Sequence, residues 1–390
     1  MEQLIALYRS LLADTETIFV RYLHDEIDWN ARMIGIVGAR GVGKTTLLLQ
    51  HIKLFDDPEQ TLFLSADDLY FSEHRLFDMA ADFYRNGGKR LYIDEVHKYA
   101  DWSKELKMMY DYFPKLQVTF TGSSVLDIYK GSADLSRRVL LYTLHGLSFR
   151  EYLNLSLSKK ITPYSLEEII SRQVELPDDI SHPLPLYKAY LRGGYYPFFV
   201  EGNYGQRLRH IINITLETDI PAFSNMNAAS VKKLKQLLYI ISQSVPFKPN
   251  FTKIAQIMDV HRNQVTDYLY YLERAGIVMQ LHTETKGIRA LGKIEKVYLN
   301  NANLMYVLSD GTPDVGNIRE TAFLNQMAVR HSVFASPVAD FEINGYTFEV
   351  GGKNKTQKQL SGVTDRFVVK DDMEYGSGNV IPLWHFGMSY

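Results

Sequence analysis

Residues 33–50 constrain the fold of this chain more than any other stretch, because they join an apolar run, a glycine-rich turn and a helix start. Met33 to Val37 is apolar and has the length of a strand, and Gly38 to Thr45 fits the spacing G-x-x-x-x-G-K-[ST] without a mismatch. Thr46 to His51 then continues as a helix start. In this context the loop N–H groups and the helix N-terminus form a site for phosphate oxygens. The stretch predicts a bound nucleoside triphosphate in preference to a bare glycine turn.

The motif gives each polar group in the loop a role. We expect Lys44 to reach the β- and γ-phosphates and the Thr45 hydroxyl to ligate Mg²⁺. The loop glycines let the backbone turn tightly and aim its N–H groups at the phosphates. The residues expected to hold the nucleotide are Gly38, Ala39, Arg40, Gly41, Val42, Gly43, Lys44, Thr45 and Thr46.

A second informative stretch, Arg90 to Glu95, places two acidic residues at the end of an apolar strand. Asp94 in that position can hold Mg²⁺ through its water shell. Glu95 can polarise a water for attack on the γ-phosphate, which is the role of a general base. Such a pair is typical of nucleotide hydrolases. The alternative is an acidic pair that only opens the loop to His97.

Three further residues are candidates for contacts to the γ-phosphate or the attacking water. Ser123 follows the next predicted strand, in TFTGSS, and its hydroxyl can serve there or cap the helix that comes after it. Arg137 and Arg138 are candidates for an arginine aimed at the γ-phosphate, in cis or in trans, which is worth about 10³–10⁵ in rate. For these two arginines, a salt-bridged surface pair is the alternative.

The composition is that of an ordinary soluble protein. At 390 residues, with 46% hydrophobic and 23% charged residues, the chain has room for two or three domains with cores of their own. Cysteine is absent, which removes disulfides and thiolate chemistry and fits a reducing cytoplasm. The N-terminus lacks the signal-peptide pattern, and no run approaches the roughly 18 apolar residues of a membrane span. We expect a cytoplasmic protein without a membrane partner.

Short apolar strands alternate with helices after the phosphate loop, which predicts a parallel sheet buried on both faces. Residues 1–30 show helical spacing twice, from Leu4 to Leu12 and again from Ile18 to Leu23. The expected strands of the sheet are Thr61–Ser65, Arg90–Asp94, Leu116–Thr121 and Arg138–Leu144. The expected helices between them are His74–Arg85 and Trp102–Tyr112.

Residues 231–280 have the element order of a winged helix-turn-helix, in which a short helix, a turn at Asp259 and a longer helix lead to a strand. The segment 231–300 carries a net charge of +6. Residues His261 to Thr266 would lie where a recognition helix presents side chains to bases. Asp267 on the same helix would repel phosphate. DNA contact and a packing role are therefore equally open.

With GARGVGKT, YIDE, TGSS and LSRR in this order, the chain resembles an AAA-type ATPase. It is similar, more specifically, to the bacterial and archaeal family that joins a P-loop domain, a winged helix and a C-terminal restriction-endonuclease-like module. GLSFREYL, GGYYP and KVYLN fall where that family has similar strings. The resemblance implies an α/β fold with a three-layer parallel sheet of order 5-1-4-3-2, and ATP in place of GTP.

The resemblance also implies a division of the chain into five parts. It predicts an N-terminal helical segment, an AAA-type ATPase domain, a helical lid or linker, a winged helix-turn-helix and a small α/β nuclease-like module. In the same order, these parts cover residues 1–30, 31–147, 148–228, 229–290 and 291–390.

The C-terminal module departs from the family pattern. A nuclease of that class needs a helix Glu, a strand Asp and a Glu-x-Lys on the next strand to gather metal and activate water. Glu320, Asp340 and Glu349 match in order, but Gly351 stands where the lysine is needed, and the next lysines come two and four residues later. We favour a degenerate module used for binding over an active one with a migrated lysine.

The sequence therefore predicts a Mg²⁺-dependent ATPase whose nucleotide state repositions the winged helix and the C-terminal module. Two alternatives remain: an ATP-gated nuclease, and a nucleotide-binding scaffold with little hydrolysis. Asp94 and Glu95 argue against the scaffold, and the missing lysine argues against the nuclease. The expected partners are ATP, DNA through the winged helix, an unidentified protein and further copies of the chain.

Overall fold

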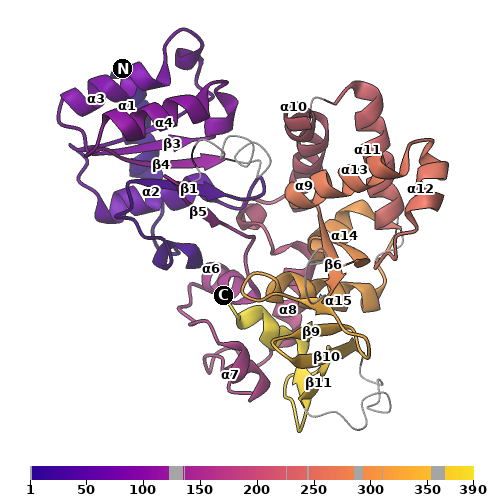
Figure 1. Cartoon of the computed structure of the whole chain (residues 1–390). Coiled ribbons are helices and arrows are strands. Elements are labelled where there is room, and N and C mark those ends of the chain that lie inside the picture. The colour runs from indigo at the N-terminus through magenta and orange to yellow at the C-terminus, as the bar shows by residue number, and fades with distance from the viewer. Residues whose placement is uncertain are drawn as a thin grey trace. The chain divides into compact units, whose positions relative to one another are not determined.

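The computed structural model describes residues 2–122, 135, 137–224, 226–243, 246–284, 293–309, 311–352 and 365–390 of the chain. They form two compact units, Met1–His145 and Gly146–Tyr390 (Figure 1). Each unit has a sheet and a buried core of its own.

The N-terminal unit is built on a parallel sheet of five strands, with helices on both of its faces (Figure 1). The strand order is β2-β3-β4-β1-β5, so the predicted order 5-1-4-3-2 is confirmed. Every residue of β1 is buried, as expected for a central strand covered from both sides. The strands are β1 (Met33–Val37), β2 (Thr61–Ser65), β3 (Arg90–Asp94), β4 (Gln117–Gly122) and β5 (Leu140–Thr143). The helices are α1 (Glu2–Asp14), α2 (Lys44–Phe55), α3 (Leu76–Arg85) and α4 (Trp102–Tyr112).

The segment before β1 differs from its prediction. The second helical repeat, predicted from Ile18 to Leu23, is wrong, because the chain there is irregular apart from a short 3-10 turn at Tyr22–Asp25. The side-chain amide of Gln50 on α2 donates to the carbonyl oxygens of Glu16 (2.8 Å) and Phe19 (2.7 Å). These carbonyls are therefore satisfied without a helix. Ile18 is 79% exposed, so its apolar side chain does not mark a core face.

The C-terminal unit combines helices with a mixed sheet of seven strands, in the order β12-β11-β10-β9-β8-β6-β7. Helix α15 lies against β10, where four buried phenylalanines pack together. None of the helices in the described ranges is long and apolar enough to cross a membrane. The strands are β6 (Val278–Thr283), β7 (Ile294–Leu299), β8 (Phe334–Ala335), β9 (Phe341–Ile343), β10 (Tyr346–Gly351), β11 (Arg366–Lys370) and β12 (Val380–Pro382). The helices include α6 (Phe149–Leu157), α7 (Leu166–Ile170), α8 (Pro183–Gly193), α9 (Tyr204–Ile214), α10 (Ile220–Ser224), α14 (Ala302–Leu308) and α15 (Val315–Met327), and a 3-10 helix, η7, covers Leu383–Met388.

Three helices and a hairpin follow one another between α10 and α14. They are α11 (Ala228–Ser242), α12 (Phe251–Met258), α13 (Arg262–Arg274) and the antiparallel pair β6–β7. This is the element order predicted for a winged helix, with Asp259 in the left-handed conformation (φ 49°) at the turn between α12 and α13. The hairpin also belongs to the seven-stranded sheet, because β6 pairs with β8. One sheet thus spans residues predicted to lie in two modules, and the five-part division stays a prediction.

GGYYP, one of the strings that carried the family resemblance, is bonded to a residue shortly after another of them, KVYLN. The side-chain amide of Asn303, three residues after KVYLN, donates to the carbonyl oxygens of Tyr190 (3.0 Å) and Leu191 (2.7 Å). Its oxygen accepts from the backbone N–H of Tyr195 (2.8 Å) and from the hydroxyl of Tyr204. One buried asparagine therefore satisfies the backbone at the C-terminal end of α8 and fixes the turn that follows it.

Candidate functional site

The phosphate loop lies between β1 and α2, and its glycines are required by its shape. A Cβ on Gly38 would lie 2.3 Å from the carbonyl oxygen of Leu144. Gly43, directly before α2, has a φ of 95°, which other residues adopt only with strain. The ammonium of Lys44 donates to the carbonyl oxygens of Gly38 (3.0 Å) and Ala39 (3.1 Å). The amine is therefore held inside the loop, where the motif predicts the phosphates.

Two oxygens from different elements meet beside this lysine. The hydroxyl of Thr45, on the first turn of α2, donates to one carboxylate oxygen of Asp94 at 2.6 Å. Asp94 ends β3, and its other carboxylate oxygen accepts a hydrogen bond from Thr121 on β4. Since the carboxyl ends of parallel strands share one edge of the sheet, the fold brings these groups together across 76 residues of chain.

The pair formed by Thr45 and Asp94 fits a Mg²⁺ ion. A hydroxyl and a carboxylate are the protein ligands that Mg²⁺ takes beside phosphate oxygens and water. Burial raises the pKa of Asp94, because the charged form loses its hydration, while the hydrogen bonds from Thr121 and Thr45 act in the opposite direction. A divalent cation at this position would stabilise the ionised form. The donor set and the burial both match the predicted metal site.

Glu95 lies one residue beyond the sheet edge, in a strained backbone conformation. Its φ of 51° is in the left-handed region, which is uncommon outside glycine and concentrates at functional sites. The backbone N–H of Glu95 donates to the Thr121 hydroxyl (3.1 Å), and its carboxylate lies 3.5 Å from Nε2 of the buried His97. The carboxylate is thus directed by its neighbours and does not extend freely into solvent.

Thr121 is a positioning residue that the sequence analysis did not choose. One hydroxyl bonds both Asp94 and the backbone of Glu95, so it fixes the two acidic residues relative to each other. The available signal was its place at the end of the strand between those of Lys44 and Asp94. Ser123, the hydroxyl residue chosen there, lies outside the described residues.

Arg21 is a second residue that sequence reasoning missed. It is 4% exposed, and its guanidinium donates to the carbonyl oxygens of Val42 in the phosphate loop and of His145 after β5. The available signal was a charged side chain inside the apolar segment from Ile18 to Leu23. Through Arg21 the loop is bonded to the last residue of the N-terminal unit.

Arg137 and Arg138 do not join the phosphate loop within their own chain. They precede β5, which runs parallel to β1, whereas the loop follows the last residue of β1. The length of β5, four residues at about 3.3 Å each, separates the two edges of the sheet. Arg138 pairs with Asp111 on α4 at 3.1 Å. Arg40, in the loop itself, is half-buried.

The basic surface predicted on α11–α13 is reduced by ion pairs. Lys235 pairs with Glu217, Lys248 with Glu295 and Lys296 with Glu320. Lys232, Lys248, Lys253, Arg262 and Lys293 remain exposed, as do the other polar residues at the start of α13. Two of the counted cations, Lys286 and Arg289, lie outside the described residues. Glu217 and Glu320 lie outside residues 231–300, so only these two pairs lower the positive excess that was counted for the segment.

The nuclease-like acids contact a lysine that the sequence analysis did not connect to them. Lys296, on β7, lies 3.0 Å from Glu320 on α15 and 3.6 Å from Asp340. The hydroxyl of Tyr298 also donates to Glu320 at 2.8 Å. In the part of the chain that the structure describes, no three acidic, histidine or cysteine side chains are grouped as metal ligands. The lysines that follow Gly351 lie outside that part.

Comparison with known proteins matches two segments of the chain. Residues 30–153 match the family described as an AAA domain, and residues 184–314 match a domain of unknown function. The first match contains the phosphate loop, Asp94 and Glu95, and it supports an AAA-type P-loop domain. An uncharacterized protein of Methanocaldococcus jannaschii is 24% identical over 291 residues, covering 68% of this chain and 60% of that protein. The chain thus spans about 60% of the length of this relative.

Several solved structures overlap the chain at low sequence identity. The Walker-type ATPase of Pyrococcus abyssi overlaps with a TM-score of 0.42 at 11% identity, covering 74% of this chain and 95% of that one. DnaA of Aquifex aeolicus, bound to AMPPCP, overlaps with a TM-score of 0.25 at 13% identity, covering 68% and 86%.

Proposed function

We propose that the chain is a Mg²⁺-dependent ATPase whose nucleotide state acts on its C-terminal unit. The observation that carries the proposal is the meeting of the Thr45 hydroxyl and the Asp94 carboxylate, 2.6 Å apart, between Lys44 and Glu95. An AAA-type domain over the same residues supports it. A scaffold without hydrolysis would not need a carboxylate held at the position of Glu95.

Each residue has a defined part in the reaction. The loop N–H groups and Lys44 bind the β- and γ-phosphates, and Thr45 and Asp94 hold the metal ion. Bound Mg²⁺ neutralises phosphate charge. Glu95 accepts a proton from a water whose oxygen bonds to the γ-phosphorus, while the bond from that phosphorus to the β–γ bridging oxygen breaks. The products are ADP and inorganic phosphate.

Arg21 provides a route from the nucleotide to the C-terminal unit. It bonds the carbonyl of Val42, inside the phosphate loop, and that of His145, the residue before the C-terminal unit begins. A shift of the loop on release of phosphate would change the bond between Arg21 and Val42. Arg21 would then move, and its bond to His145 would move with it. The proposed repositioning of the winged helix and the C-terminal sheet begins at this arginine.

The ATPase proposal is tested by phosphate release from purified protein over a concentration series, with Mg²⁺ or with EDTA. We expect hydrolysis with Mg²⁺ and none with EDTA, since Thr45 and Asp94 would lose their ion. If Arg137 or Arg138 acts in trans, from a neighbouring copy, activity per protomer should rise with protein concentration. Hydrolysis that persists in EDTA would contradict the metal site. Activity that stays constant on dilution would remove the arginines from the proposal.

The exposed cations of α11–α13 support weak DNA binding without cleavage. We expect the double variant Lys232→Glu, Arg262→Glu to lose duplex binding in a fluorescence anisotropy assay at low salt. The matched control is Lys104→Glu, Lys115→Glu, which makes the same charge change at exposed positions of the N-terminal unit and should bind as the wild type does. Wild-type binding should weaken as salt rises, because contacts to phosphates release counterions.

The same samples test the C-terminal module for nuclease activity. Plasmid should remain supercoiled with Mg²⁺ or Mn²⁺ and ATP, because no three acidic, histidine or cysteine side chains are grouped as metal ligands among the residues that the structure describes. Nicking that is lost in Asp340→Ala and survives in Glu95→Gln would instead identify an ATP-independent nuclease with Lys296 as its migrated lysine. DNA binding that does not respond to salt or to the double variant would favour a packing role for the three helices.

A further inference from the structure

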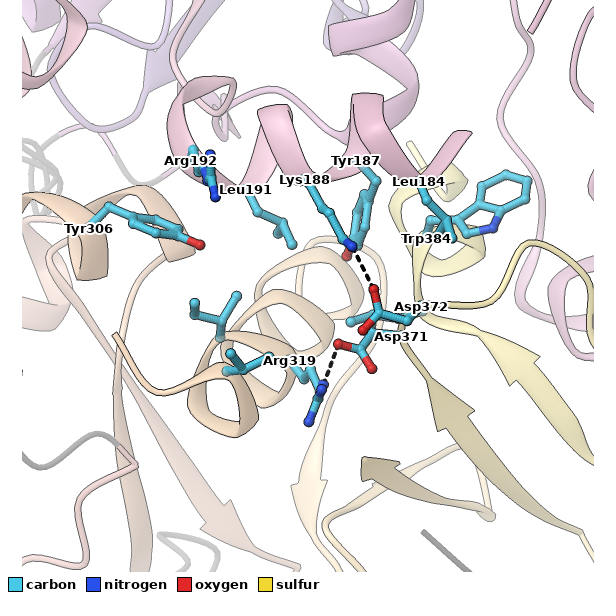
Figure 2. A pocket seen from close by; sticks show the side chains of 13 residues that line it. Leu184, Tyr187, Lys188, Leu191, Arg192, Tyr306, Arg319, Asp371, Asp372 and Trp384 are labelled. Atoms are coloured by element: carbon cyan, nitrogen blue, oxygen red, sulfur yellow. Dashed lines mark ion pairs between the residues drawn. The ribbon is translucent and has the colours of Figure 1, made fainter. Parts of the chain in front are cut away.

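A cavity in the C-terminal unit lies far along the chain from the phosphate loop and has no part in the proposed ATPase reaction. It has a volume of about 280 Å³ and lies where α8, α14, α15, η7 and the segment after β11 meet (Figure 2). Its lining includes residues from both ends of this unit, from Leu184 to Trp384. At about 30 Å³ of liquid volume per water, the space equals that of about nine waters, which suits a small organic molecule.

One part of the cavity wall is apolar. Leu184 and Leu191 contribute from α8, Ile318 from α15, and Leu383 and Trp384 from η7. Ile318, Leu383 and Trp384 are buried in the unit, so this wall is preformed and belongs to the packed core. An apolar body of a ligand would gain free energy by displacing water from this wall.

The wall also carries five charged side chains, whose charges do not balance. Lys188 pairs with Asp372 at 2.7 Å, and Arg319 pairs with Asp371 at 2.5 Å (Figure 2). The fifth, Arg192, lies one helical turn beyond Lys188 on α8, and no carboxylate among the described residues pairs with it. The cavity therefore keeps one uncompensated positive charge, at the end where Figure 2 also shows Tyr306.

Two further polar groups of the cavity lack partners among the described residues. The hydroxyls of Tyr187 and Tyr306, which also line the cavity, make no hydrogen bond to a described residue. A hydroxyl oxygen accepts hydrogen bonds, so a ligand donor at Tyr187 would be favourable.

From this arrangement we infer that the cavity binds a small monocarboxylate with an apolar body and one neutral hydrogen-bond donor. The carboxylate pairs with Arg192 beside the Tyr306 hydroxyl, and the apolar body covers Leu191, Ile318 and Trp384. The donor, an amide N–H or a hydroxyl, bonds the hydroxyl oxygen of Tyr187. A neutral donor is required, because Arg319 already compensates Asp371 and an added ammonium would restore the excess charge. An N-acylated apolar amino acid has this chemistry, whether free or as the end of a peptide.

The test uses isothermal titration calorimetry on the full chain with four probes. N-acetyl-L-phenylalanine should bind. N-acetyl-L-phenylalaninamide, which lacks the carboxylate, and free L-phenylalanine, which adds an ammonium, should each bind at least roughly tenfold more weakly, the usual effect of losing or opposing one charged hydrogen bond. N-acetyl-Ala-Ala-Phe distinguishes the sources, since it binds as well as the short acid or better only if the natural ligand is a peptide end.

Variants separate the cavity from non-specific binding. Arg192→Gln should weaken the binding of N-acetyl-L-phenylalanine by a factor of roughly 10 to 100. Arg192 is exposed, so this variant should fold, which thermal melting would check. The control, Arg207→Gln on α9, removes an arginine that does not line the cavity and should leave binding unchanged. Equal affinity for the acid and its amide, equal affinity in Arg192→Gln, or no heat with any probe at millimolar concentration would overturn the inference.

Discussion

Replacing Glu95 with glutamine is expected to abolish ATP hydrolysis and leave ATP binding intact. Glutamine has nearly the same shape but does not accept a proton, so it removes the general base and keeps the surroundings. Thr45 and Asp94, which hold the metal ion, are untouched by the change. A positioned base contributes about 10²–10⁴ in rate, and we expect phosphate release to fall by roughly that factor.

The measurement pairs phosphate release at saturating ATP with the binding of a fluorescent ATP analogue. The matched control is Glu73→Gln, an exposed glutamate of the same unit that lies outside the site. It should hydrolyse ATP as the wild type does. Equal rates for wild type and Glu95→Gln would remove Glu95 from its proposed role and direct attention to His97, 3.5 Å from its carboxylate.

Replacing Lys44 with alanine is expected to abolish nucleotide binding. Lys44 is 5% exposed, and its ammonium donates hydrogen bonds to the carbonyl oxygens of Gly38 and Ala39 within the loop. When ATP binds, the amine can exchange these neutral acceptors for β- and γ-phosphate oxygens. Charge-assisted hydrogen bonds contribute about 1.5–3 kcal/mol each. The loss of two of them should therefore weaken ATP binding by at least roughly a hundredfold.

Lys53→Ala is the control for this variant, because it removes a lysine from the same helix. The Lys53 amine bonds the carbonyls of Ala13 and Thr15, on the side of the N-terminal segment. ATP affinity in this control should match that of the wild type, even if the melting temperature falls. Full ATP affinity in Lys44→Ala, measured by the same fluorescent titration, would mean that the loop does not bind triphosphate in the proposed way.

Local sequence patterns were sufficient to predict the strands of the N-terminal sheet. The bounds of β2 and β3 were predicted to the residue, since each is a short apolar run that ends at a polar residue or a turn. The phosphate loop was predicted with its glycines, because its backbone needs conformations that few residues adopt. These features depend on neighbours in sequence, so the sequence alone determined them. The strand order was implied by the family resemblance, and the sheet confirms it.

Long-range contacts decided the rest. The role of Thr121 depends on its hydrogen bond to Asp94, and the role of Arg21 depends on its bond to the carbonyl of His145. No spacing in the sequence predicts such pairs. The excess of cations on residues 231–300 was correct as a count, but pairing with Glu217 and Glu320 removes part of it from the surface. No lysine stands at position 351, and the pairing of Lys296 on β7 with Glu320 and Asp340 became visible only in the structure.

The sequence by itself therefore determined the nucleotide loop, the acidic pair and the strands that present them, because each is encoded by adjacent residues. The tertiary structure alone decided which side chains meet across the sheet edge, which charges stay unpaired and where a second cavity forms. The physical reason is that hydrogen bonds and ion pairs act over a few ångströms in space, whatever the separation along the chain.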